Sequence, residues 1–203
     1  MNRIGILLFD GVEELDFVGP YEVFTMTNEV FLHEGKPRPH EVMLLAERDA
    51  PIVCAKGMRV LPQNTTAQCS ALDIVLIPGG QGTRREVENK ILLDWIANVS
   101  EEAQWITSVC TGALLLAAAG PARGKRVATH WAFAETLRTR GEVGRVLEGM
   151  RYVRDGNLVT AAGVSAGIDM ALWLIGQLHG AAMARKVQRA MEYDPAPPYA
   201  AEA

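Results

Sequence analysis

Short apolar runs alternate with longer segments of helical period along almost the whole chain, and this alternation constrains the fold most. Strand-length runs occupy residues 3–9, 42–46, 72–77 and 105–109. The segments of helical period occupy residues 16–32, 86–99, 111–120, 165–178 and 181–193. Strands that are buried on both faces are typically continuous apolar runs, and helices are the usual connection between parallel strands. The pattern predicts an α/β three-layer sandwich with a mostly parallel sheet and helices on both faces.

The alternation shows no break at which a second domain would begin. We expect one α/β domain over residues 1–193 and an irregular, proline-rich tail, DPAPPYAAEA, over residues 194–203. Asp155 and Gly156 predict a hairpin between two short strands, and Ser165 is a candidate N-cap for the helix that follows it. Gly120 is expected to end the helix before it.

Charge and composition exclude several classes of protein. The formal net charge is −4, and no cluster of Lys and Arg suggests a nucleic-acid surface. No apolar stretch is long enough for a membrane helix, and the N-terminus lacks a signal-peptide pattern. The three cysteines, Cys54, Cys69 and Cys110, have neither metal-ligand spacing nor an even number for disulfides. We therefore expect a soluble, cytoplasmic protein with reduced thiols.

Cys110 is the strongest candidate for chemistry because it lies where an apolar strand meets a helix, in the stretch ITSVCTGALLLAAAG. A thiol at a helix N-terminus faces unpaired amides, which favour the thiolate, lower the thiol pKa and can hold an oxyanion. The small residues Gly112 and Ala113 allow the tight turn of a nucleophile elbow. From spacing alone, the alternative is a buried cysteine that acts only as a small apolar side chain.

Several motifs together resemble the ThiJ/PfpI superfamily, which has a flavodoxin-like, class I glutamine amidotransferase-like fold. These motifs are SVCTG after the apolar strand, IPGG at an earlier strand end, ATHW downstream and AAGVSAGIDMAL near the C-terminus. The resemblance covers nearly the whole chain and includes the spacing between motifs. It implies that Cys110 is the nucleophile and that Asp16 is the acid against it.

The resemblance also places the rest of the site. Many relatives have Glu at the position of Asp16. The aspartate at this position, together with the segments FVGP, CTGALLLAAAG and THWAF, makes the chain most similar to the isonitrile hydratase branch. The amides after Gly79 and at Thr111 would form the oxyanion and substrate site together with Gly80, and the Thr111 hydroxyl could bond to Asp16. The resemblance implies a homodimer with the site near its interface.

Each of these residues has a plainer interpretation. Asp16 near a helix start is commonly a cap or a dipole partner, and Glu13 and Glu14 are rival acids. His130, next to Trp131, suggests a Cys/His pair. However, the peptidases and amidotransferases of this superfamily have their histidine almost at once after the cysteine, whereas Leu114 and its neighbours supply none here. We interpret His130 as structural or as lining the pocket.

The remaining histidines, cysteines and tryptophans are expected to pack or to lie on the surface. His33, His40 and His179 are predicted surface or packing residues, and Cys54 and Cys69 are predicted to be inert. The tryptophans expected in the core are Trp95, Trp105 and Trp173.

The resemblance implies hydration of an isonitrile to an N-substituted formamide through a thioimidate on Cys110. Asp16 would act as acid and then base, without a metal or an organic cofactor. For this cycle Asp16 must begin protonated near neutral pH, through apolar surroundings or competition with the thiolate for one proton.

Other functions remain open. ThiJ/PfpI-like domains also form the N-terminal half of AraC-type transcription regulators, so a ligand- or redox-sensing module is one alternative. Only ten residues follow Tyr193, and they do not suffice for a helix-turn-helix domain. Glyoxalase-like or peptidase activity is the other alternative; the aspartate at position 16 and the missing adjacent histidine weigh against both.

Overall fold

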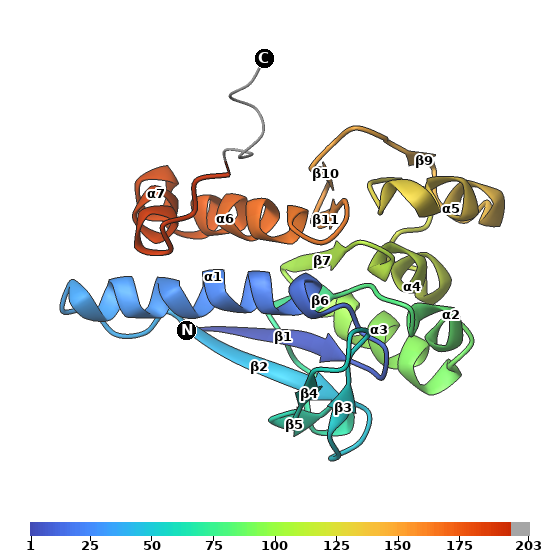
Figure 1. Ribbon diagram of the computed structural model, residues 1–203, viewed down its shortest axis with the longest axis horizontal. Coiled ribbons are helices and arrows are strands. Elements are labelled where there is room, and N and C mark those ends of the chain that lie inside the picture. The colour runs from blue at the N-terminus through green and yellow to red at the C-terminus, as the bar shows by residue number, and fades with distance from the viewer. Residues whose placement is uncertain (196–203) are drawn as a thin grey trace.

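A seven-stranded sheet forms the centre of the protein in the computed structural model, which describes residues 1–195 (Figure 1). The strand order is β10-β11-β7-β6-β1-β2-β5. Neighbouring strands are parallel except at β10 and β11. The strands are β1 (Asn2–Leu8), β2 (His40–Ala46), β5 (Asn64–Thr65), β6 (Ile74–Ile77), β7 (Trp105–Val109), β10 (Tyr152–Asp155) and β11 (Leu158–Ala161).

Helices cover both faces of the sheet, which confirms the predicted α/β sandwich. On one face α1 (Glu14–His33), α6 (Ala166–His179) and α7 (Ala181–Ala190) pack together; on the other, α3 (Lys90–Glu102) packs with α4 (Gly112–Ala119) (Figure 1). The short helices α2 (Thr83–Glu86) and α5 (Ala134–Arg140) lie toward the end of the molecule to which β1 points. Both therefore lie near the carboxyl ends of the central strands, where α/β proteins form their sites.

Smaller elements complete the description of residues 1–195. Two two-stranded sheets, neither of them predicted from the sequence, pair β3 (Ile52–Val53) with β4 (Arg59–Val60) and β8 (Arg126–Val127) with β9 (Arg145–Val146). Two 3-10 turns cover Thr66–Gln68 and Trp131–Phe133. Of the expected tail, residues 196–203 lie outside the described part of the chain.

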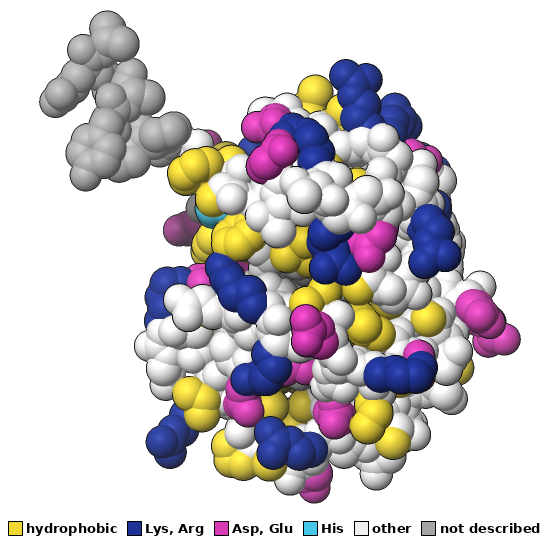
Figure 2. Space-filling view, turned by 90° about the vertical axis from the view of Figure 1, so that its right-hand side faces the viewer, with side chains coloured by type: hydrophobic (Ala, Val, Ile, Leu, Met, Phe, Trp, Pro, Cys, Tyr) yellow, Lys and Arg dark blue, Asp and Glu magenta, His cyan; other side chains and the backbone are white. Residues whose placement is uncertain are grey.

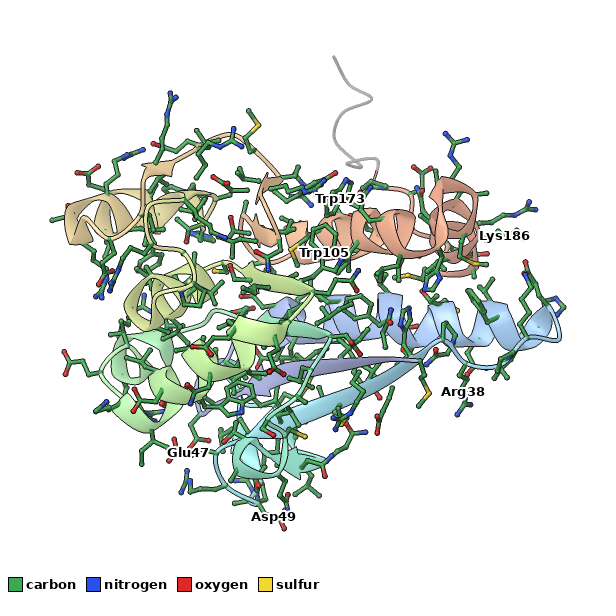
Figure 3. All side chains as sticks on the ribbon, turned by 180° about the vertical axis from the view of Figure 1, so that it is seen from behind. Arg38, Glu47, Asp49, Trp105, Trp173 and Lys186 are labelled. Carbon is green, nitrogen blue, oxygen red and sulfur yellow. The ribbon has the colours of Figure 1, made fainter. Side chains whose placement is uncertain are left out.

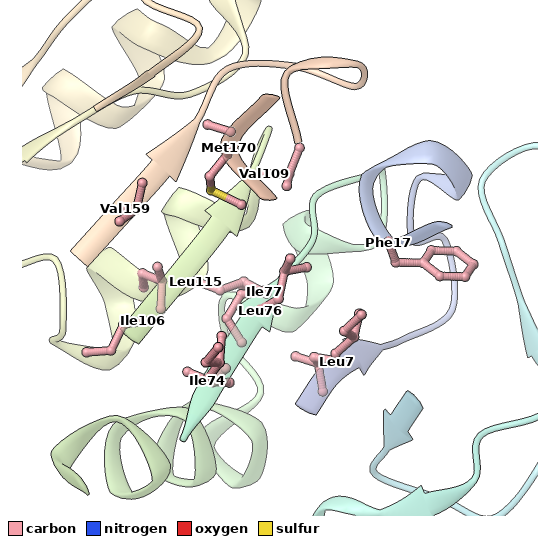
Figure 4. Packing of buried hydrophobic residues seen from close by; sticks show 14 of the residues in the cluster. Leu7, Phe17, Ile74, Leu76, Ile77, Ile106, Val109, Leu115, Val159 and Met170 are labelled. Atoms are coloured by element: carbon pink, nitrogen blue, oxygen red, sulfur yellow. The ribbon is translucent and has the colours of Figure 1, made fainter. Parts of the chain in front are cut away.

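The central strands are buried along their whole length, as their apolar runs predict. All residues of β6 and β7 are buried, and Figure 4 shows side chains such as Leu76, Val109 and Met170 packed between the strands and α6. Each fully buried Leu or Ile contributes about 1.5–3 kcal/mol relative to an exposed one. Packing therefore fixes the strand ends that carry the site.

Two tryptophans extend the core toward the edge of the sheet. The rings of Trp105 and Trp173 meet edge to face, with centroids 5.6 Å apart (Figure 3). The guanidinium of Arg154 lies 5.1 Å from the centroid of Trp105. Trp105 is buried, and Trp95 and Trp173 are partly buried against the core, which agrees with the expected packing roles.

Two predicted helix features are wrong. The helix expected over residues 86–99 starts later, because α2 ends at Glu86 and α3 begins at Lys90, where Asn89 is the N-cap and accepts a hydrogen bond from the Leu92 amide at 3.3 Å. Ser165 does not cap α6 with its side chain; its hydroxyl instead accepts a hydrogen bond from Arg151 at 3.2 Å. The predicted hairpin is confirmed, since Asp155 pairs with Leu158 across the turn.

Charged side chains of both signs are interspersed on the face drawn in Figure 2. That face therefore has no field of one sign that would attract a polyanion. Across residues 1–195, none of the helices combines the length and hydropathy that a membrane crossing needs.

Candidate active site

Cys110 occupies a strained turn between β7 and α4, as the nucleophile elbow predicts. Its φ angle is 56°, in the left-handed region that non-glycine residues seldom adopt. Its amide donates to the carbonyl oxygens of Ala161 and Ala162, at 3.2 and 2.7 Å, and its carbonyl accepts from the Thr129 hydroxyl at 2.8 Å. The neighbouring strand and loop thus hold the strained backbone in place.

The turn also needs a residue without a side chain directly after it. A Cβ atom on Gly112 would lie 2.0 Å from the carbonyl oxygen of Ile77, the last residue of β6. The absence of that atom lets the start of α4 approach the end of β6. The elbow and the Pro78–Gly80 loop after β6 are thereby brought into contact.

Asp16, the third residue of α1, is fully buried beside the thiol. Its Oδ2 accepts a hydrogen bond from the Gly79 amide at 2.9 Å. The Cys110 thiol and the Val164 amide also lie close enough to this carboxyl group to lower its pKa. Oδ1 is buried without a fixed partner among the described residues, and a buried carboxyl oxygen in that position favours a proton or a donor from a ligand. The structure thus brings together Asp16 and Cys110.

Burial raises the pKa of Asp16 to about 7, and the nearby Glu13 carboxylate adds to the rise. The Gly79 amide acts in the opposite direction because it stabilises the carboxylate. Asp16 is therefore partly protonated near neutral pH. A carboxyl group with this pKa can both accept and release a proton near neutral pH, as an acid and base must.

The expected lowering of the Cys110 pKa is wrong. Burial raises the pKa of this thiol to about 12, and the Asp16 charge raises it further, whereas the amide and hydroxyl of Thr111 lower it. The amide at the helix start thus acts in the expected direction, but desolvation outweighs it. The thiol and the Asp16 carboxyl group are best described as one pair that shares protons.

The loop after β6 and the start of α4 are joined through two threonines. The Thr111 hydroxyl accepts a hydrogen bond from the Gly80 amide at 3.0 Å and from the Thr83 hydroxyl at 3.1 Å. The Thr83 hydroxyl also lies 2.8 Å from the Gly80 carbonyl oxygen. The suggested contact of the Thr111 hydroxyl with Asp16 is not what the structure shows, because this network already engages the hydroxyl.

The predicted oxyanion donors differ in their availability. The Gly79 amide is bonded to Asp16 and the Gly80 amide to Thr111. The Thr111 amide instead lies near the Cys110 sulfur, whose pKa it lowers. Thr111 is therefore the amide best placed for charge that develops next to the sulfur.

Cys110 reaches a small pocket of about 160 Å³. Cys110 is 7 % exposed, so the residue is largely buried but lines this pocket. His130 lines the same pocket, and its Nδ1 accepts a hydrogen bond from the Ala132 amide at 3.2 Å. The pocket residues are Glu13, Gly80, Gln81, Arg84, Cys110, Thr111, His130, Phe133 and Val164.

Both rival acids are engaged with Lys56. Glu13 forms an ion pair with the Lys56 side chain, and Glu14 accepts a hydrogen bond from the Lys56 amide at 2.8 Å. Glu13 lines the pocket, but neither residue hydrogen-bonds Cys110. Asp16 is thus the acid in contact with the thiol.

Sequence reasoning missed Thr83, Arg84, Phe133 and Val164 at this site. Val164 has a φ angle of 50°, which is strained for a β-branched residue. It belongs to the GVS segment of a recognised motif, and that segment was the one available signal. The guanidinium of Arg84 lies 4.6 Å from the Phe133 centroid at the mouth of the pocket, and no sequence pattern indicated that pair.

The other two thiols lie elsewhere in the core. Cys54 and Cys69 are buried, and burial raises the pKa of Cys54 to about 11. Within residues 1–195, His, Cys, Asp and Glu side chains do not gather in groups of three that could hold a metal ion.

Comparison with known proteins gives consistent relatives. Residues 2–177 match the DJ-1/PfpI family. The chain is 40% identical to an isonitrile hydratase of Pseudomonas putida over 197 residues, which are 97% of this chain and 81% of that protein. It is 28% identical to the HTH-type transcriptional regulator GbdR of Pseudomonas aeruginosa, covering 95% of this chain and 51% of the regulator.

Solved structures show the same fold. A ThiJ/PfpI family protein from Pseudomonas syringae superimposes with a TM-score of 0.87 at 30% identity, over 100% of this chain and 79% of that one. DJ-1beta of Drosophila melanogaster superimposes with a TM-score of 0.81 at 20% identity, covering 95% of this chain and 98% of that one. At 20% identity, the similarity to DJ-1beta concerns the fold alone.

Proposed function

Since the chain belongs to the DJ-1/PfpI family, we propose that it hydrates isonitriles to N-substituted formamides with Cys110 as nucleophile and Asp16 as acid and base. One observation carries the proposal: a fully buried carboxyl group, whose pKa is raised to about 7, lies close enough to the thiol at a strained elbow for the two groups to shift each other's pKa. The likeness to the isonitrile hydratase of Pseudomonas putida supports the choice of substrate.

An isonitrile, R–N≡C, accepts both a nucleophile and a proton at its terminal carbon. The raised pKa of Cys110 makes a free thiolate costly, so attack and proton transfer are expected to occur together. As the sulfur–carbon bond forms, the thiol proton passes through Asp16 to the same carbon. The product is a thioimidate, R–N=CH–S–Cys110, and the pair has lost its shared proton to the substrate.

Hydrolysis then restores the pair. The Asp16 carboxylate accepts a proton from water as the oxygen bonds to the thioimidate carbon, and Asp16 then passes this proton to the nitrogen. The tetrahedral intermediate R–NH–CH(OH)–S–Cys110 collapses when the carbon–sulfur bond breaks. Sulfur and Asp16 recover their proton, and R–NH–CHO leaves. The Thr111 amide, which lowers the pKa of the thiol, is available to stabilise charge beside the sulfur in both steps.

The raised pKa of Cys110 weakens the redox-sensing alternative, because peroxide reacts with thiolates and a buried thiol is a poor thiolate. GbdR and its relatives are regulators, and this chain spans about half of their length. Ligand sensing without turnover is the alternative that the first experiment must separate from hydration.

The experiment mixes purified protein with an aromatic isonitrile and follows formamide absorbance. We expect turnover by the wild type and a loss of at least about a thousandfold for Cys110→Ala and for Asp16→Asn. Cys54→Ala is the matched control and should retain activity. No wild-type turnover contradicts the hydratase, and turnover by Cys110→Ala contradicts the mechanism.

We also propose that the protein acts on small molecules as a cytoplasmic homodimer, a proposal supported by the family alone. Light scattering in solution should then give twice the 22.1 kDa of one chain.

A further inference from the structure

A second hollow adjoins the Cys110 pocket. It measures about 410 Å³, and His130 and Val164 line both spaces. The Cys110 pocket alone, at about 160 Å³, is below the roughly 300–1,000 Å³ typical of small-molecule sites. It has room for the small N≡C group, and a larger substituent needs adjoining space.

Apolar residues form much of the lining of the second hollow. Seven of them line it: Trp131, Ala134, Val146, Leu147, Met150, Ala162 and Val164. Trp131 and Met150 are 79 % and 53 % exposed, unlike the buried side chains of the core. Large exposed apolar groups around a hollow are typical of a binding surface.

The charged groups of the hollow are already paired with protein. Arg151 donates to Asp169 at 2.6 Å and to Ser165 at 3.2 Å, and Glu148 forms an ion pair with Arg138. Neither charge is therefore free to recognise a charged ligand. A charged substituent would lose its hydration there without gaining a partner.

Gly163 and Val164 lie at the boundary between the two spaces, and the backbone there allows a close contact with His130. A Cβ atom on Gly163 would lie 2.3 Å from Cδ2 of His130, so the glycine lets the imidazole lie directly against the loop. Because His130 Nδ1 accepts from the Ala132 amide, the proton of the neutral ring is on Nε2. Val164 follows at its strained φ angle of 50°, with its amide close enough to the Asp16 carboxyl group to lower the pKa of that group.

From this arrangement we infer that the hollow lined by Leu147 and Met150 is the subsite for the substituent of the isonitrile, and that it selects uncharged, apolar substituents. This inference rests on the proposed function. The terminal carbon would lie at Cys110, and the substituent would extend past His130 and Val164. The two residues that line both spaces argue for one occupant that spans them.

The test uses Leu147→Trp, which fills the half-buried side of the hollow without touching Cys110, Asp16 or Thr111. Leu61→Trp is the matched control, because Leu61 is 67 % exposed in a different part of the chain. For benzyl isonitrile, kcat/KM should fall at least about tenfold in Leu147→Trp, mainly through KM, while methyl isonitrile changes by less than about twofold. Wild-type protein should use isocyanoacetate poorly.

Equal losses for both isonitriles, or no loss for either, would overturn the subsite. A changed oligomeric mass of Leu147→Trp with unchanged selectivity would assign the hollow to a second copy of the chain and also overturn it. Calorimetric binding of N-benzylformamide separates this inference from the hydratase. Weaker binding to Leu147→Trp supports the subsite even without turnover, and equal binding by both proteins contradicts it.

Discussion

At the Cys110 sulfur, the start of α4 and burial act in opposite directions. The Thr111 amide and hydroxyl favour the thiolate, whereas desolvation and the Asp16 charge favour the thiol, and the latter two win. Reactivity at this site therefore depends on where the shared proton lies during attack. A low resting pKa does not account for it.

This balance predicts an effect of Asp16→Asn on the thiol itself. Removal of the carboxylate removes one of the causes that raise the Cys110 pKa, so alkylation of Cys110 by iodoacetamide at pH 8 should become about threefold to tenfold faster. Turnover should nevertheless disappear, because no group carries the proton. Peptide mass spectrometry measures the alkylation rates of Cys110 and Cys54 in one sample.

Cys54 provides the internal control for that experiment. Its pKa is raised to about 11, chiefly by burial, with contributions from Glu14, Asp10 and Glu13 but not from Asp16. Its alkylation should not change. If Cys110 reacted more slowly in Asp16→Asn than in the wild type, the assigned coupling between the two groups would be wrong.

At the scale of elements, two histidines join α1 and β2 to the end of α6. Nε2 of His40, the first residue of β2, lies 3.1 Å from Nε2 of His179, the last residue of α6. The ring of Phe31 in α1 packs edge to face on His179. One imidazole must donate and the other accept, so the contact requires that the pair is not fully protonated.

Acid should loosen this contact. Burial, the His179 charge and the N-terminal amine lower the pKa of His40 to about 4, from an unfolded value near 6.5. When the pKa of a histidine falls on folding, the free energy of unfolding decreases as the pH falls from the unfolded pKa to the folded pKa. The reason is that the unfolded chain binds the proton first. The loss is about 3 kcal/mol at most.

Thermal unfolding between pH 7 and 4.5 measures this effect. Because the raised pKa of Asp16 stabilises the fold as the pH falls over the same range, the histidine effect is measured against variants: on acidification the wild-type melting temperature should fall relative to those of His40→Phe and His179→Phe. Glu34, whose pKa is lowered to about 2 by Lys186 and Lys36, contributes only at lower pH. An unchanged pH dependence in both variants would contradict the role of the pair.

The same elements show which parts of the structure could be predicted. The buried runs of β1, β6 and β7 and the Asp155–Gly156 turn are local signals, and their predictions are confirmed. The break at Asn89 and the contact between His40 and His179 depend on tertiary packing between distant segments. Their local sequences do not show these contacts.

For the molecule as a whole, the family and the fold were predictable because several spaced motifs point to one arrangement of strand ends. The proximity of Asp16 to Cys110 came from that resemblance and not from any local pattern, since 94 positions separate the two residues by their numbers. The sign of the thiol pKa shift could not be predicted, because burial is a property of the folded chain. Val164 and Thr83 were missed for the same reason.

The pH dependence of kcat/KM for an isonitrile tests the shared proton of Cys110 and Asp16 most directly. Below about pH 7 both groups are protonated, and the form with one proton becomes dominant above it. The wild-type kcat/KM, corrected for the uncatalysed reaction, should therefore rise about tenfold per pH unit up to about pH 7 and then level off. A flat or falling profile between pH 5 and 8 would contradict the account.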